Sequence, residues 1–181
     1  MKDSQRLTYR PWKRSDVDTM VELKNDPMVL RGLGLDGKTF THDNAKDVIR
    51  GVKTKSSVIG QDFAVCLKST KEIIGEVSVV YDPQKKVNIS GAIWIAQKYQ
   101  GQGYGREVLR ARNEYCFNEL GLDTVNTSCL SDNRPSRNMQ KKLGFRVFDV
   151  KDWEHNGKKN VKLVRARLTK RDYQKHEGAL G

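Results

Sequence analysis

One segment of the sequence restricts the fold more than any other: a strand-like stretch that leads through three alternating glycines into a long helical pattern. Residues 94–96 are apolar, Gly101, Gly103 and Gly105 follow, and an apolar helical face continues to Leu120. The first amides of a helix have no partner within it, and the helix dipole gives this end partial positive charge. Glycine also lets a ligand approach the backbone closely. The segment therefore predicts a strand–turn–helix unit that binds a phosphate or pyrophosphate.

Other phosphate-binding patterns fit this segment less well. A Walker loop ends in Gly-Lys followed by Ser or Thr, whereas an arginine follows Gly105. A dinucleotide fingerprint needs G-x-G-x-x-G, and counting from Gly101 or Gly103 its last glycine would fall on Arg106 or Val108. A flexible glycine loop without a ligand is the alternative that the segment alone leaves open.

Hydrophobic periodicity predicts a single α/β (α+β) domain over residues 1–181, with the order β-α-α-β-β-β-α-β-α-β-β. Three consecutive strands read as an antiparallel meander, residues 28–42 as a glycine-rich loop with a short helical turn, and the residues from Arg171 onward as a frayed tail. Strands are expected over 6–12, 63–67, 73–81, 87–96, 124–130, 145–150 and 161–168. Helices are expected from Ser15-Asp16 to Asn25, from Thr41 or Asp43 to Val52, over 103–120, and from Asn133 or Ser136 to Leu143.

Composition excludes several classes of protein. No apolar run approaches the ~20 residues of a membrane helix, and the N-terminus does not resemble a signal peptide, so we expect a cytoplasmic protein. Three cysteines without a CxxC pair and three scattered histidines predict neither a disulfide framework nor a metal site. A net charge of +12 favours polyanions, either RNA or a ribosome on one hand, or a polyphosphorylated cofactor on the other.

Two motifs carry a family resemblance. The sequence QGQGYG over 100–105 is similar to the Q/R-x-x-G-x-G/A signature of the GNAT superfamily, and NRPSRNMQKKLGF over 133–145 resembles the N-x-x-S…K-L-G-F motif of its RimJ/RimL-like branch. The opening LTYRPW over 7–12 is also similar to that branch. The resemblance, over about residues 6–168, implies a mixed, mostly antiparallel central sheet of about 6–7 strands with helices on both faces. It also implies an N-acetyltransferase that moves the acetyl group of acetyl-CoA to a primary amine, with a protein N-terminus as the first choice.

The resemblance assigns the cofactor site to matched positions. Backbone amides from Gln102 to Arg106 would hold the CoA pyrophosphate, Ile93 and Ile95 would pair with the pantetheine arm, and Asn133 would touch the arm from the other wall. The predicted cofactor site comprises Ile93, Ile95, Gln100, Gly101, Gln102, Gly103, Tyr104, Gly105, Arg106 and Asn133. The 3′-phosphate would meet Arg106, Arg137, Lys141 or Lys142, each of which also reads as part of a solvated basic face.

The resemblance also gives catalytic candidates. The Ile95 amide would stabilise the developing oxyanion, and the Ser136 hydroxyl would stabilise or protonate the CoA thiolate. A helix N-cap is the alternative role of Ser136. Many relatives carry a glutamate where this chain has Ser90 and a tyrosine where it has Gln140. The general base is left open between water and the carboxylates of Glu76, Asp149, Asp152 and Glu154.

Alternatives for the acceptor and the activity stay open. The acceptor could be a small amine (a polyamine or an aminoglycoside) or aminoacyl-tRNA, although a charge of +12 disfavours free polycations. A GNAT-fold protein that binds CoA or nucleic acid without turnover is the non-enzymatic alternative. Similar proteins commonly form homodimers. Trp12, Trp94 and Trp153 are expected either in the core or along a substrate pocket.

Overall fold

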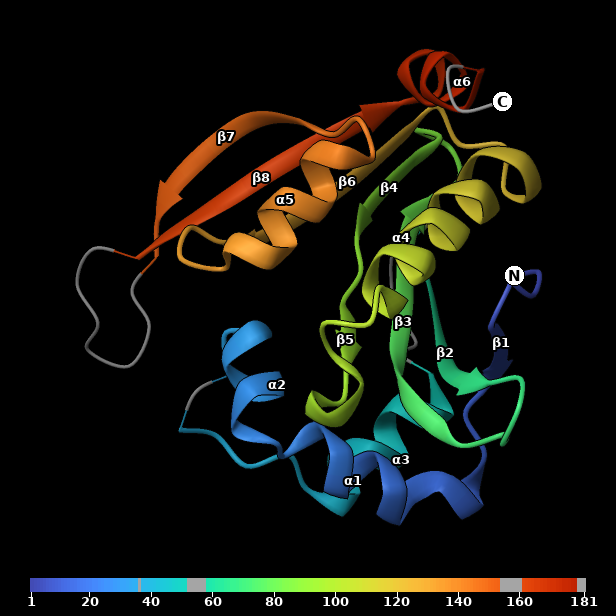
Figure 1. Cartoon of the computed structure of the whole chain (residues 1–181), viewed down its shortest axis with the longest axis vertical. Coiled ribbons are helices and arrows are strands. Elements are labelled where there is room, and N and C mark those ends of the chain that lie inside the picture. Colours follow the sequence, from blue (N-terminus) through green and yellow to red (C-terminus); the bar gives the residue numbers. More distant parts are fainter. Residues whose placement is uncertain (36, 52–57, 154–160, 179–181) are drawn as a thin grey trace.

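The computed structural model describes residues 1–35, 37–51, 58–153 and 161–178 (Figure 1). Its core is a mixed sheet of eight strands, covered by helices. The strands are β1 (Leu7–Pro11), β2 (Ile59–Leu67), β3 (Ile73–Asp82), β4 (Val87–Ser90), β5 (Ile93–Ile95), β6 (Thr124–Leu130), β7 (Arg146–Asp152) and β8 (Lys162–Thr169). The helices are α1 (Val17–Lys24), α2 (Pro27–Gly32), α3 (His42–Arg50), α4 (Tyr104–Glu114), α5 (Arg134–Lys142) and α6 (Lys170–Gly178).

The strand order confirms the expected sheet. It runs β1-β2-β3-β4-β6-β8-β7, and β5 pairs with β3 outside this path. All pairs are antiparallel except the pair of β4 with β6. That parallel pair is short, since only Val87 and Asn88 are matched with Thr124 and Val125. The sheet consequently divides beyond this point, and the predicted meander forms one side of the division.

A break between β4 and β5 corrects the expectation of one strand over 87–96. Gly91 has a φ of 149°. A Cβ at Gly91 would overlap the carbonyl oxygen of Ser78 on β3, so only glycine permits this approach. The chain turns away from β6 here, and β5 continues along β3 alone. Within the part of the chain that the structure describes, one side of β5 therefore has no strand beside it.

Helices cover the two faces of the sheet, each over its own apolar cluster. On one face, Val108 and Ala111 of α4 pack with Leu7, Val65 and Val77 of the strands. On the other face, Met20 of α1 and Ala45 of α3 pack with Trp12, Ala64 and Trp94. In Figure 1, α1, α2 and α3 lie together at one end of the molecule, and α5 and α6 lie toward the other. In the part of the chain that the structure describes, no helix is both long and apolar enough to cross a membrane.

The short helical turn expected near the start of the glycine-rich loop is α2, whose first amides are capped by the Asp26 side chain. Two other helical segments differ from expectation. The expected helix over 103–120 is α-helical only to Glu114 and continues as a π-helical segment, Tyr115–Glu119. The expected frayed tail forms α6, because Thr169 and Asp172 cap its start and Tyr173 stacks on Phe117 with ring centroids 4.8 Å apart.

Candidate functional site

The division of the sheet is the base of a cleft with a volume of about 950 Å³. Strand β5 and the glycine turn form one wall, β6 and the start of α5 form the other, and residues of α2 lie at the mouth. Of the predicted cofactor positions, Ile93, Ile95, Gln100, Gly101, Gly105 and Asn133 line this cleft, whereas Gln102, Gly103, Tyr104 and Arg106 are not part of the lining. The structure thus brings both sequence motifs to one cavity.

The backbone of β5 presents unpaired groups to the cleft. The Ala92 carbonyl accepts from the Ser78 amide, and the Ala96 amide donates to the Ile74 carbonyl, so these two residues face β3. Alternate residues of a strand point their backbone groups in opposite directions, and Ile93 and Ile95 therefore face the cleft. The Ile95 carbonyl already accepts a bond from the Gln100 side chain at 2.8 Å. The Ile95 amide remains as the donor to a ligand.

The glycine turn has positive φ angles at two of its glycines. Gly101 and Gly103 have φ values of 75° and 84°, which disfavour any side chain. Gly103 is the N-cap of α4, and the next amides, from Tyr104 to Arg106, have no partner within the helix. A Cβ at Gly105 would lie 3.6 Å from the sulfur of Met139 on α5, an ordinary contact distance, so the two walls of the cleft lie close together here.

Arg6 braces the glycine turn from outside, a role that no sequence pattern indicates. Its Nη1 donates to the Gln102 carbonyl at 3.1 Å, and its Nε donates to Glu107 at 2.8 Å. Its guanidinium also lies 4.2 Å from the centre of the Tyr104 ring. Because Glu107 lies in the first turn of α4, the N-terminal segment fixes the start of this helix.

The opposite wall contains a small polar cluster. The Asn133 side chain accepts from the Ser136 amide at 3.1 Å and is the N-cap of α5. Of the two residues that the sequence left open as the start of this helix, Asn133 is the N-cap and Ser136 is not. The Ser136 hydroxyl instead accepts a bond from the buried Gln140 side chain at 3.1 Å. Ser136 also lies within hydrogen-bonding reach of the Cys129 thiol: burial raises the pKa of Cys129, and hydrogen bonding from Ser136 opposes this rise.

A comparison with known protein families identifies this arrangement. The model of the acetyltransferase (GNAT) domain matches residues 6–146, which include both motifs and most of the residues that line the cleft. The chain belongs to the GNAT family. It is an acetyl-CoA-dependent N-acetyltransferase. No group of three or more His, Cys, Asp or Glu side chains that could hold a metal ion occurs among residues 1–35, 37–51, 58–153 and 161–178.

Relatives and solved structures agree with the family. The uncharacterized N-acetyltransferase p20 of Bacillus licheniformis is 24% identical over 173 residues, which cover 94% of this chain and 96% of p20. The uncharacterized N-acetyltransferase YnaD of Bacillus subtilis (strain 168) is 28% identical over 145 residues, covering 79% and 81%. A spermidine N-acetyltransferase from Vibrio cholerae, in complex with CoA and spermine, superposes with a TM-score of 0.80 at 19% identity, covering 93% and 98% of the two chains. At this identity the last comparison shows the fold alone.

The carboxylates expected from the sequence lie outside the lining of this GNAT cleft. Glu76 is buried under α1, where it accepts from Lys24 at 3.0 Å and from the Trp94 indole at 3.1 Å. Asp149 and Asp152 are on β7 and face Arg165 and Lys162. Glu154 lies outside the described residues. Ser90, at the position where many relatives have a glutamate, does line the cleft.

Asp62 is a titratable group near the site that sequence reasoning missed. It lies on β2 directly opposite Ser78 of β3, and Ser78 lines the cleft. Burial, and then the neighbouring Glu76 charge, raise the pKa of Asp62 to about 6, while Lys24 and hydrogen bonding from Ser78 act in the opposite direction. A carboxyl group with this pKa changes its charge close to neutral pH. The only sequence signal was an acidic residue at the start of an apolar strand.

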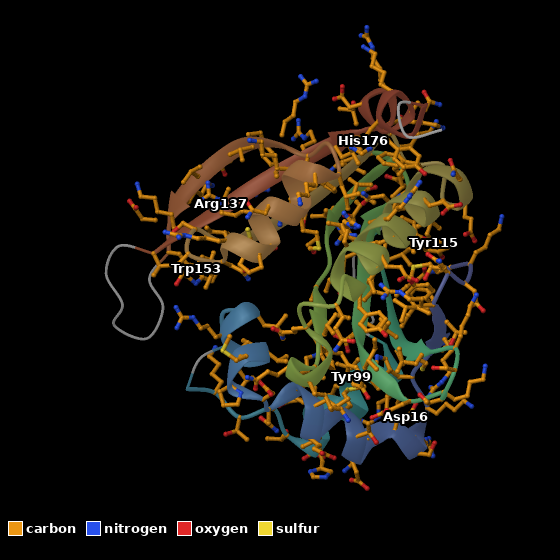
Figure 2. The ribbon with its side chains drawn as sticks, viewed as in Figure 1. Asp16, Tyr99, Tyr115, Arg137, Trp153 and His176 are labelled. Carbon is orange, nitrogen blue, oxygen red and sulfur yellow. The ribbon has the colours of Figure 1, made fainter. Side chains whose placement is uncertain are left out.

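The remaining predicted side chains divide between surface and cleft. Arg106, Arg137, Lys141 and Lys142 are exposed, and Arg137 donates to the Ser131 carbonyl at 3.2 Å. Trp12 is a core residue, and Trp94 is both buried and part of the cleft lining. Trp153 lies just beyond the outer end of β7, on the side that faces α2 (Figure 2). It also lines the cleft, so the pocket interpretation applies to two of the three tryptophans.

Proposed function

We propose that this GNAT enzyme acetylates the α-amine of a polypeptide, as the RimJ/RimL-like resemblance implies. The observation that carries the proposal is the free edge of β5 leading directly into the glycine turn. The pantetheine arm would add to this edge at Ile93 and Ile95 as an extra strand, and Asn133 would face it from the other wall. The pyrophosphate would be held by the amides from Gln102 to Arg106, with Gly101 and Gly103 allowing its approach.

The charge of the cleft favours a polypeptide acceptor over a polyamine. Among the described lining residues, Asp132 is the one carboxylate, and it already pairs with Arg31 at 2.8 Å. The lining also includes the arginine at position 112. A polyamine carries several ammonium groups, and a site without free carboxylates leaves these groups uncompensated. An α-amine presents one ammonium group beside neutral peptide carbonyls and needs no such compensation.

Direct attack suits the residues in the cleft. The amine nitrogen would attack the thioester carbonyl carbon, whose oxygen would be stabilised by a cleft-facing amide of β5, that of Ile95 or that of Ile93, which lies nearer to Gly91. As the carbon–sulfur bond breaks, Ser136 would donate its proton to the CoA thiolate and take up, through water, the proton that the acylated nitrogen releases. Gln140 would orient Ser136 for this step, since its side chain donates to the hydroxyl oxygen. This direct path needs no cysteine nucleophile.

Asp62 is the proton acceptor that we propose for the ammonium group, acting through Ser78 and water. Its pKa of about 6 is about 2 units below that of an α-amine and about 4 below that of a lysine amine. Transfer to Asp62 is therefore about 100-fold less unfavourable from the α-amine. The pKa difference and the cleft charge consequently favour the same acceptor.

An acceptor panel with acetyl-CoA tests this function. Peptides with a free N-terminus should release CoA thiol, whereas the same peptides with a blocked N-terminus and an internal lysine should release little. Spermidine should also be a poor acceptor. Gly103→Trp is the matched control, because a bulky side chain at this positive φ should abolish acetyl-CoA stabilisation in thermal unfolding. Preference for spermidine over every free peptide would overturn the acceptor, and no stabilisation of the wild type by acetyl-CoA would overturn the cofactor site.

A further inference from the structure

Arg112 of α4 is a buried charge without a counter-charge. Its side chain has 0% exposure, and Nη1 donates to the Gly91 carbonyl at 3.2 Å. Its Nε and Nη2 have no hydrogen-bond partner. Burial lowers the pKa of Arg112, and no carboxylate among the described residues opposes this effect. A guanidinium in such a place is costly unless an acceptor reaches it.

The unpaired atoms lie on one edge of the guanidinium. Nε–H and one Nη–H point in the same direction and form the fork that binds a carboxylate with two parallel bonds. The third nitrogen, Nη1, is the one that holds the Gly91 carbonyl. A neutral carbonyl oxygen would satisfy part of this fork but would leave the buried charge uncompensated. The chemistry of Arg112 therefore matches a carboxylate.

The position of Arg112 corresponds to the reacting end of the cleft. It lines the cleft together with Gly91, where β4 and β5 separate. The helix rises about 1.5 Å per residue, so Arg112 lies about 12 Å beyond Tyr104 along α4. The pantetheine arm has the chain length of roughly four residues, about 14 Å when extended. An arm that begins at the glycine turn therefore brings its acyl group to the level of Arg112.

We propose that Arg112 is a binding site for a carboxylate carried by one of the two substrates, either at the far end of the acyl group of a dicarboxylic acyl-CoA or on the acceptor. The proposal rests on the CoA site proposed above. A dicarboxylic acyl group would extend beyond the thioester toward α4, so the donor is the first source to test. In that case the amine attacks the thioester carbonyl, the carbon–sulfur bond breaks, CoA leaves as the thiol, and the distal carboxylate stays on Arg112 throughout.

Access to the fork requires a small rearrangement of its neighbours. Both unpaired nitrogens are out of contact with solvent. Leu109 lies one turn before Arg112 and lines the same cleft, as does Met139 of α5. Both side chains pack in one cluster, and the unbranched methionine adapts easily to a new shape. A bound acyl carboxylate would take the space that these side chains occupy.

The donor experiment compares CoA, acetyl-CoA and succinyl-CoA by calorimetric titration in the wild type, Arg112→Met and Arg112→Lys. The methionine variant removes the charge and should fold, since it also removes the desolvation cost of an uncompensated buried guanidinium. The lysine variant keeps the charge and loses the fork. We expect the wild type to bind succinyl-CoA about 10- to 100-fold more tightly than acetyl-CoA, and Arg112→Met to lose this preference with an unchanged affinity for CoA.

The acceptor experiment uses acetyl-CoA and pairs of acceptors that differ only in a carboxylate, such as a dipeptide and its C-terminal amide. If the carboxylate belongs to the acceptor, the KM of the acid should be about 10- to 100-fold lower than that of the amide, and Arg112→Met should equalise them. Equal affinities within both the donor pair and the acceptor pair in the wild type would overturn the inference. The inference would also be overturned if the wild-type preference survived in Arg112→Met. An equal loss of affinity for every ligand in that variant would overturn it too, because this is the result expected if Arg112 only braces Gly91. If the wild type did not bind CoA at all, that result would instead contradict the proposed cofactor site.

Discussion

Replacement of Lys24 by methionine should destabilise this enzyme strongly. The new side chain has a similar length, and the change removes only the ammonium group. Lys24 Nζ lies 3.0 Å from Glu76 Oε1. The Lys24 and Glu76 side chains are 9% and 3% exposed, so water cannot replace the lost partner. Trp94 still donates to Oε1, but Glu76 Oε2 has no partner at all. The variant therefore leaves an uncompensated carboxylate in the core.

The magnitude follows from this burial. Removing one partner of a buried ion pair costs about 3–5 kcal/mol. For a chain of this size each kcal/mol shifts the midpoint by about 2–4 °C, so a fall of roughly 10 °C is expected. Urea unfolding followed by tryptophan fluorescence measures the free energy directly. The double variant Lys24→Met with Glu76→Gln should recover most of the loss, because it also removes the stranded charge.

A second lysine–glutamate pair in the chain is the matched control. Lys98 and Glu72 are only 2.7 Å apart, but their side chains are 60% and 43% exposed. Lys98→Met should therefore shift the unfolding midpoint far less than Lys24→Met, because solvent screens an exposed ion pair. If Lys24→Met and Lys98→Met proved equally mild, or if the double variant failed to recover stability, the argument that burial makes the Lys24 pair decisive would be refuted.

Three further predictions concern the site. Gly91→Ala should destabilise the fold and weaken acetyl-CoA binding, because the new Cβ meets the Ser78 carbonyl at the base of the cleft; an unchanged unfolding midpoint and Kd would contradict this account of the strand break. The pKa of Asp62 is about 6 in the folded protein, above its ordinary value of 3.8. The free energy of unfolding should therefore fall as pH rises from 3.8 to about 6 and Asp62 becomes charged. Asp62→Asn should consequently be more stable than the wild type at pH 8 and equal to it near pH 4, which thermal unfolding across pH will check, and it should lower kcat with a peptide acceptor. Ser136→Ala should lower kcat about 10- to 100-fold with little change in KM if its hydroxyl protonates the thiolate, whereas equal kcat values would assign that proton to water.

The sequence was most informative where a local pattern and a local structure coincide. The strand expected over residues 124–130 is β6 with the same bounds. The Thr41 hydroxyl caps α3 by accepting from the Asn44 amide, as its place before an apolar helical pattern predicts. The glycine turn leads into α4 because the positive φ angles at Gly101 and Gly103 are a local property of those residues. These features depend on neighbours within a few positions, which a single sequence contains.

The features that the sequence did not predict depend on contacts between distant segments. An apolar pattern from Val87 to Ala96 does not reveal that Gly91 must press against Ser78 of another strand. The tail forms α6 partly because Tyr173 finds Phe117, which lies more than fifty positions earlier. Asp62 becomes unusual only when the register places it opposite Ser78 and beside Glu76. No local pattern contains these pairings.

Arg112 shows most directly why a periodic pattern leaves the chemistry of a site open. On a helical wheel, an arginine between Ala111 and Asn113 reads as part of the polar face of α4, yet all three residues are buried. The sheet divides beneath this part of the helix, so its side chains meet a cleft where an undivided sheet would offer an apolar surface. The same strand break that frees the edge of β5 for the cofactor therefore also provides the place for a buried charge. A carboxylate on the acyl group or on the acceptor would occupy the cleft and compensate the Arg112 guanidinium in one contact.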